Sequence, residues 1–307
     1  MPLEIYQIII LILIGSLVGI SLSFIGQTGQ VIVLPTVLLI TGDVFLAIAI
    51  NLLNDLITSA FVSIKYVKSK QYKIRKDIII IIVIGILTSI LSVFILMTTL
   101  LGNIYGWFIP LFIIFLGLLF IKRGFPTADT INNTIQKITS KILKKSVNED
   151  RITELGKKID DRSIAEGDKV QGLIPSSSRL YYLLTIFFGI FIGVNSGLFG
   201  ANSGLLFVLA LVILYGYPLK KGVGTALILS AILCFSTFII YQILGFTIKG
   251  QFYFNLEISV FLAIGSIITG VITSIYVQKL SAKIMGQGIG ILIIVLGILS
   301  LIFYFIT

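Results

Sequence analysis

Long apolar runs alternate with short polar segments along almost the whole chain. The runs lie at about 5–24, 31–41, 45–64, 78–101, 104–121, 181–198, 204–214, 223–246, 257–277 and 284–306. Most have roughly the 20 residues that an α-helix needs to cross the hydrocarbon core of a bilayer. Their apolar residues are continuous instead of alternating, which argues against a membrane β-barrel. The pattern predicts an all-α polytopic membrane protein.

Two of the runs, 31–41 and 204–214, are too short to span a membrane alone. Each follows a full-length run across a Gly-rich break. The first break reads Gly26-Gln27-Thr28-Gly29-Gln30, and the second reads Gly200-Ala201-Asn202-Ser203-Gly204. Irregular backbone at membrane depth is tolerated only where it is buried in protein or lines a cavity. Both breaks are therefore candidate functional sites.

The breaks belong to a repeat that covers both halves of the chain. The matched glycines, at a constant offset of 174, are Gly15 with Gly189, Gly19 with Gly193, Gly26 with Gly200, and Gly42 with Gly216. Each half then supplies three more long runs. Internal duplication on this scale is typical of secondary transporters. We expect repeats at 1–121 and 181–307, each made of a broken, re-entrant unit and three transmembrane helices.

Positive charges indicate how the two halves are oriented. The short loops of half one carry Lys65, Lys68, Lys70, Lys73, Arg75 and Lys76, and those of half two carry Lys220, Lys221, Lys249, Lys279 and Lys283. If each broken unit returns to its side of entry, the halves are inverted and all of these except Lys249 lie on one side. Parallel halves would separate them into seven and four. The positive-inside rule favours inverted repeats, with both termini outside.

The composition supports a membrane protein and excludes several other classes. The chain is 57% hydrophobic and 12% charged, whereas a soluble domain is roughly 25% charged. The net charge of +10 does not indicate a nucleic-acid partner, because all 23 Lys and Arg lie between the apolar runs. With no His and a single Cys, a zinc protease, a His-dependent triad and a disulfide scaffold are excluded. We expect no catalytic residue, metal site or cofactor.

The segment 122–180 differs from the rest of the chain. It contains 12 Lys and Arg and 8 Asp and Glu. Within it Ile131, Ile135, Ile138 and Ile142 recur at helical spacing opposite several lysines, which predicts an amphipathic helix packed on the protein or lying on the membrane. We interpret 122–180 as a charged cytoplasmic loop.

The two breaks together form a candidate anion site. The half-helix that begins after each break points its positive dipole end at the break. Two such ends near the membrane midplane would bind an anion, although no Lys or Arg lies within the apolar runs. The predicted substrate-binding residues are Gly26, Gln27, Thr28, Gly29, Gln30, Asn51, Asn195, Gly200, Ala201, Asn202, Ser203, Gly204 and Thr225. The alternative is that the glycines only allow close helix packing, which we prefer for Gly15, Gly19, Gly189 and Gly193.

Asp55 is the one carboxylate deep inside an apolar run. Asn51, four residues before Asp55, and Thr58 and Ser59, three and four residues after it, lie on the same helical face, with Asn54 beside them. An acid inside a membrane span is costly and by default marks a functional site. We predict that Asp55, assisted by Asn54, carries a coupling proton. The alternative is an Asp that is hydrogen-bonded by the two asparagines and locks helix packing.

In the order of these motifs the chain resembles the TauE/SafE sulfite exporter family. Members carry G-x-x-x-G and then a glycine-rich turn in each half, which Gly15/Gly19 and Gly189/Gly193 match together with the two breaks. Gly222-Val223-Gly224-Thr225-Ala226 is similar to the family's G-T-S motif, with Ala in place of Ser. The resemblance covers about 5–121 and 181–306 and omits the charged loop. It implies transport of sulfite, an organosulfonate or a related small anion.

These observations predict a multi-pass secondary transporter of a small sulfur-containing anion in the cell membrane. Its expected partners are the anionic substrate and the lipid bilayer, and self-association into a homo-oligomer stays open. One alternative is a membrane-embedded assembly protein that binds a soluble partner through 122–180. An intramembrane enzyme is disfavoured, because Cys234 and Asp55 have no evident catalytic partners. The substrate, the direction of transport and the coupling ion stay open.

Overall fold

The apolar runs form long helices. The computed structural model describes residues 4–25, 30–75, 78–98, 179–200, 203–277 and 279, and within these ranges all regular structure is helical. The helices are α1 (Ile5–Ile25), α2 (Gln30–Thr41), α3 (Val44–Lys68), α4 (Ile78–Thr98), α8 (Arg179–Phe199), α9 (Gly204–Tyr215), α10 (Leu219–Leu244) and α11 (Leu256–Val277), with a π-helical turn, Gly245–Lys249, after α10. The runs 104–121 and 284–306 and the charged segment 122–180 lie outside the described residues.

Six of these helices are long and apolar enough to cross a membrane. The spans are Ile5–Ser23, Val44–Lys68, Ile78–Thr98, Tyr181–Phe199, Lys220–Lys249 and Leu256–Val277. Their outer faces expose large apolar side chains such as Leu13, Leu87, Leu183, Phe235 and Ile268. Such a surface is unfavourable in water and suited to lipid. The prediction of an all-α, multi-pass membrane protein is confirmed.

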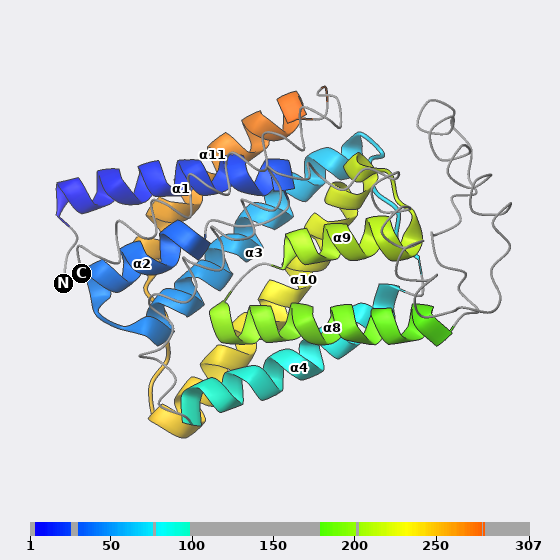
Figure 1. The fold of residues 1–307 in the computed structure, drawn as a ribbon. Coiled ribbons are helices and arrows are strands. Elements are labelled where there is room, and N and C mark those ends of the chain that lie inside the picture. The colour runs from blue at the N-terminus through cyan, green and yellow to red at the C-terminus, as the bar shows by residue number, and fades with distance from the viewer. Residues whose placement is uncertain are drawn as a thin grey trace, which may run out of the picture.

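The longest interfaces join the first helix of each half to the last described helix of the other. α1 lies beside α11, and α8 lies beside α4 (Figure 1). A Cβ on Gly15 would overlap the carbonyl oxygen of Leu262, and one on Gly193 would overlap that of Gly85. Backbones this close are possible only where side chains are absent. The interpretation of the G-x-x-x-G pairs as packing residues is confirmed.

The same arrangement of neighbours occurs in both halves. The bounds of α1 and α2, shifted by 174, are those of α8 and α9. α2 packs on α3 as α9 packs on α10, and α3 contacts α11 as α10 contacts α4. Gly42 and Gly216, also 174 apart, both have positive φ, at 68° and 64°, and both end a short helix. The duplication seen in the glycine positions therefore extends to helix lengths and helix partners.

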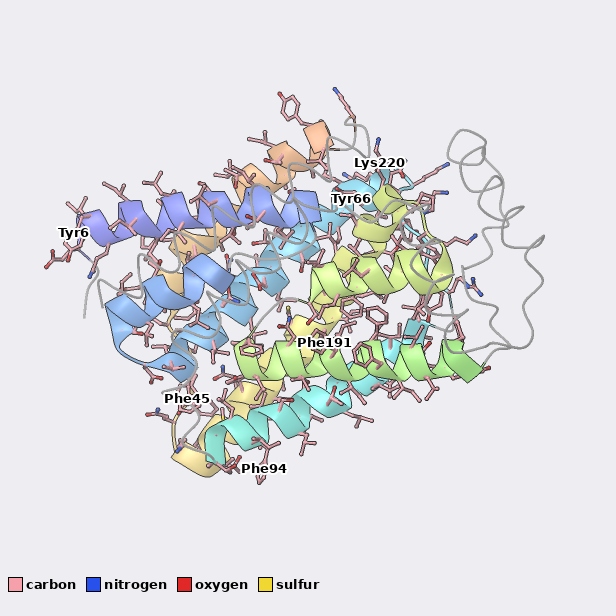
Figure 2. The ribbon with its side chains drawn as sticks, in the orientation of Figure 1. Tyr6, Phe45, Tyr66, Phe94, Phe191 and Lys220 are labelled. Carbon is pink, nitrogen blue, oxygen red and sulfur yellow. The ribbon has the colours of Figure 1, made fainter. Side chains whose placement is uncertain are left out.

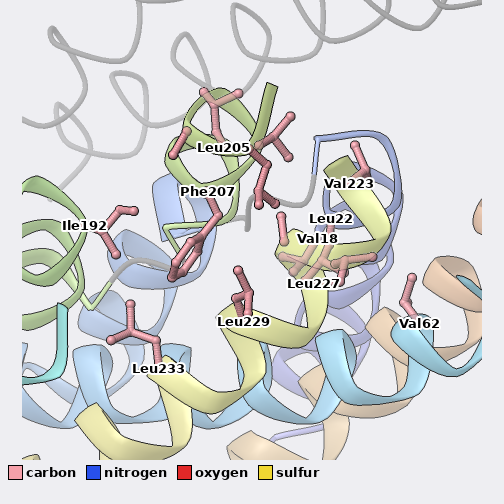
Figure 3. Packing of buried hydrophobic residues seen from close by; sticks show 14 of the residues in the cluster. Val18, Leu22, Val62, Ile192, Leu205, Phe207, Val223, Leu227, Leu229 and Leu233 are labelled. Atoms are coloured by element: carbon pink, nitrogen blue, oxygen red, sulfur yellow. The ribbon is translucent and has the colours of Figure 1, made fainter. Parts of the chain in front are cut away.

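α3 and α10 cross at the centre of the molecule and run in opposite directions (Figure 1). The ring of Phe45, at the start of α3, packs at a tilt against that of Tyr253, beyond the end of α10, with ring centroids 5.4 Å apart. At the other end, Lys73 hydrogen-bonds to Thr225 in the first turns of α10. A buried apolar cluster joins α10 to α1, α8 and α9 (Figure 3). This packing holds the middle of α3 away from lipid.

Candidate functional site

Polar side chains gather on the buried side of α3. Those of Asn51, Asn54, Asp55, Thr58 and Ser59 are all 0% exposed. Asp55 lies one position from the middle of Val44–Lys68, at the greatest depth that a spanning helix reaches. Burial of polar groups there costs free energy unless they are hydrogen-bonded. We call these five residues the α3 polar cluster.

The α3 polar cluster is hydrogen-bonded to two other helices. Asn51 Nδ2 donates to Asp55 Oδ2 at 3.3 Å and to the Gly200 carbonyl oxygen, just after α8, at 2.6 Å. Ser266 Oγ of α11 donates to Asn54 Oδ1 at 2.9 Å. It also lies 2.7 Å from Thr58 Oγ1. The cluster therefore connects the second break to α3 and α3 to α11.

The two asparagines of the α3 polar cluster each have a side-chain atom with no hydrogen-bond partner among the described residues. Among the described residues, neither Asn51 Oδ1 nor Asn54 Nδ2 has a hydrogen-bond partner, and both atoms are buried. Leaving such a group unpaired costs about 1–3 kcal/mol, and native structures have few of them. One acceptor and one donor are thus available next to the Asp55 carboxylate.

The second break is shaped by glycine and tied back to α8. Gly200 has φ of +58°, a left-handed conformation that glycine adopts without strain. A Cβ there would lie 2.5 Å from Cγ2 of Ile48. Ser203 Oγ donates to the Ile192 carbonyl at 2.8 Å and accepts from Asn195 Nδ2 at 3.2 Å. Gly200, Asn51, Asn195 and Ser203 are therefore brought together immediately before α9, which begins at Gly204 as predicted.

The first break is described only at its end. Gln30 is the first residue of α2, so the half-helix that follows the first break also begins where the sequence predicts. In Figure 1 the first turns of α2 and α9 lie toward the middle of the molecule, and the two helices run away from it in opposite directions. Gly26, Gln27, Thr28, Gly29, Ala201 and Asn202 lie outside the described residues.

Thr225 is not brought to the α3 polar cluster. Its hydroxyl donates to the Lys221 carbonyl at 2.8 Å and accepts from the Lys73 backbone N–H at 3.0 Å. Thr225 therefore joins the start of α10 to the loop after α3, near the end of α3 instead of its middle. Thr225 lies in the motif that resembles the family's G-T-S sequence. Its hydrogen bonds hold the loop after α3 against the first turns of α10.

Ser266 is a member of the site that sequence reasoning missed. It is one of several serines in the apolar run of α11, and no motif surrounds it. Its position matches Ser92 of α4 at the offset of 174, and both side chains are buried, at 0% and 5% exposure. Two serines at equivalent positions of the two repeats are the sequence signal that could have identified it.

Basic residues gather at one end of the molecule. Lys65 and Lys68 end α3, and Lys220 and Lys221 begin α10 beside it. Figure 2 shows Tyr66 and Lys220 at this same end. The Arg75 guanidinium lies 5.7 Å from the ring centroid of Tyr215, at the end of α9, within the range of a cation–π interaction. Lys249 lies at the opposite end of α10.

Comparison with known proteins gives one family. The sequence model described as "Sulfite exporter TauE/SafE" matches residues 11–300, a range that includes most of α1, both breaks and α11. No curated protein and no solved structure matches the chain.

Proposed function

The chain belongs to the TauE/SafE sulfite exporter family, and we propose from this that it is a secondary transporter of a small sulfur-containing anion, such as sulfite, thiosulfate or an organosulfonate, across the cell membrane. The family is one of transporters, not enzymes, and six apolar helices of spanning length in the described part of the chain agree with it. The observation that carries the proposal is the hydrogen bond from Asn51, in the middle of α3, to the Gly200 carbonyl. It links a break in one half of the chain to a buried carboxylate in the other.

The anion binds between the first turns of α2 and α9. The first four N–H groups of a helix have no intrahelical partner, and with the helix dipole they favour a negative charge. Gly26–Gln30 and Gly200–Gly204 supply backbone that a ligand can approach closely. Ser203, together with Asn195, adds polar side chains beside the start of α9. This arrangement binds an anion without the cost of a buried Lys or Arg.

Asp55 couples anion movement to a proton. In its ionised form it accepts a hydrogen bond from Asn51 Nδ2, which also donates to Gly200. Protonation at Asp55 Oδ2 removes the charge that holds Asn51 in this position, and the Gly200 carbonyl loses its oriented donor. Proton binding is thereby transmitted to the second break. Asn54, held by Ser266, fixes the neighbouring turn of α3.

The two halves are inverted repeats, at 1–121 and 181–307, joined by the cytoplasmic segment 122–180. This orientation is supported by the opposite directions of α3 and α10 and by the basic residues at one end (Figures 1 and 2). A binding site between inverted repeats can open to either side of the membrane by equivalent movements.

Paired glycine variants test the anion site. Gly200→Ala places a Cβ against Ile48 in a left-handed conformation, and we expect it to weaken sulfite binding by about tenfold or more, which corresponds to about 1.4 kcal/mol. Gly42→Ala is the matched control, because φ is +68° and a Cβ would meet no described atom within 4 Å. Calorimetric titration of the purified proteins with sulfite, thiosulfate and an organosulfonate measures the difference. Equal affinities in both variants and the parent would remove the second break from the binding site.

A further inference from the structure

Two buried tyrosines make the same hydrogen bond in the two halves of the chain. Tyr66 Oη of α3 donates to the Ser23 carbonyl of α1 at 3.1 Å, and Tyr241 Oη of α10 donates to the Gly197 carbonyl of α8 at 2.8 Å. The two side chains are 1% and 0% exposed. Ser23 and Gly197 correspond at the offset of 174, whereas the two tyrosines are separated by one residue more than this offset. The bond is thus part of the duplicated architecture.

Both acceptors lie where a helix stops. Ser23 and Gly197 are each two residues before the end of their helix, at Ile25 and Phe199. The last four carbonyl groups of an α-helix have no intrahelical donor, and within a membrane no water replaces it. Each tyrosine hydroxyl therefore supplies a donor at the point where the chain leaves the helix and enters the break.

The tyrosine rings are held in place by close packing. A Cβ on Gly224 would lie 2.8 Å from Cδ1 of Tyr66, so the Tyr66 ring occupies space that only a glycine leaves open. Tyr241 lies in a buried cluster with Ile48, Leu52 and Cys234. Because both side chains are buried, the two hydroxyls have fixed positions relative to α3 and α10.

We propose that Tyr66 and Tyr241 are paired positioning residues that fasten the ends of α1 and α8 to the central helices and so set the positions of the two breaks. Tyr66 acts at the basic end of the molecule, and Tyr241 acts at the opposite end. Each tyrosine thereby controls one break. The consequence for anion affinity rests on the proposed transport function, whereas the fastening of the helix ends does not.

Local hydrogen exchange tests the fastening. Phe keeps the ring and removes only the hydroxyl, so Tyr66→Phe should raise amide exchange at residues 20–25 by about tenfold, as expected for a lost buried hydrogen bond, and leave residues 194–199 unchanged. Tyr241→Phe should do the reverse. Both variants and the parent are compared in lipid nanodiscs by mass spectrometry. Unchanged exchange, or an equal rise in both segments, would overturn the proposal.

Thr269→Val is the matched control. Thr269 Oγ1 donates to the Ser16 carbonyl at 2.8 Å, a bond between α11 and α1 that lies in the middle of α1. Its loss should leave exchange at residues 20–25 at the parental rate. An increase as large as that of Tyr66→Phe would show that any lost bond to α1 loosens its end, and would contradict a specific role for the tyrosine.

Anion affinity separates positioning from simple stabilisation. Both Phe variants should bind sulfite about tenfold more weakly while Thr269→Val binds as the parent does. A local rise in exchange with parental affinity would overturn the positioning role. If the folded parent bound none of the sulfur anions, the proposed transport function would be contradicted, and the exchange measurements would still decide whether the tyrosines fasten the helix ends.

Discussion

At the scale of single residues, Asn51 connects the buried Asp55 carboxylate to the second break, because its side-chain amide donates to both Asp55 and the Gly200 carbonyl. The sequence predicted a polar face around Asp55, and the hydrogen bonds among Asn51, Asn54, Thr58 and Ser266 place that face in the buried centre of α3. Helical spacing was sufficient to predict which α3 residues share the site. It could not identify Ser266 or the Gly200 carbonyl, because contacts between distant parts of the chain depend on how whole helices pair.

Asp55→Asn separates proton coupling from anion binding. The amide keeps the size of the side chain and can still hydrogen-bond Asn51, but it cannot exchange a proton. We expect the variant still to bind sulfite, with an affinity that no longer depends on pH, and to lose the dependence of flux on a pH gradient, measured in proteoliposomes. Ser59→Ala is the control, since among the described residues the Ser59 hydroxyl donates only to backbone carbonyls of α3. If a folded Asp55→Asn protein retained pH-driven flux, Asp55 would not be the residue that carries the coupling proton.

At the scale of elements, helix ends were predictable and helix partners were not. The short runs 31–41 and 204–214 became Gln30–Thr41 and Gly204–Tyr215, because glycine and polar residues mark both ends. The glycine spacing of α1 also predicted a close-packed face. It did not show that α11, more than 200 residues away in sequence, covers that face, since a small-residue stripe fits any helix that offers a complementary surface.

The glycine contacts of α8 give a stability prediction at this scale. Gly193→Ala places a Cβ against the Gly85 carbonyl and the Thr88 side chain, and backbone cannot yield as a flexible side chain can. We expect destabilisation of about 1–3 kcal/mol, seen as a lower unfolding temperature. Gly222→Ala is the matched control, because its nearest neighbour would be Val212 at an ordinary 3.5 Å. An equal effect of both substitutions would contradict close α4–α8 packing.

At the scale of the whole molecule, the two halves are interlocked. Each first helix packs on the last described helix of the other half (Figure 1), so neither half buries its glycine face alone. A rigid-body movement would therefore involve bundles that contain helices from both halves. The positive charges predict that the two halves are inverted, because short loops far apart in sequence all follow the positive-inside rule.

Cysteine accessibility tests the orientation. Lys68→Cys and Lys221→Cys should resist an impermeant thiol reagent added outside intact cells and react after permeabilisation, whereas Lys249→Cys should react from outside. The native Cys234 is buried and gives little background. External labelling of Lys221→Cys with protection of Lys68→Cys would support parallel halves instead.

Anion flux through the purified parent protein tests the central claim most directly. Proteoliposomes loaded with sulfite, thiosulfate or an organosulfonate should show saturable efflux of at least one anion, with competition by another of the three. The same vesicles containing Gly200→Ala should release it more slowly at low anion concentration, and those containing Gly42→Ala should behave as the parent does. Folded parent protein that moves none of the three anions faster than protein-free liposomes would contradict the account.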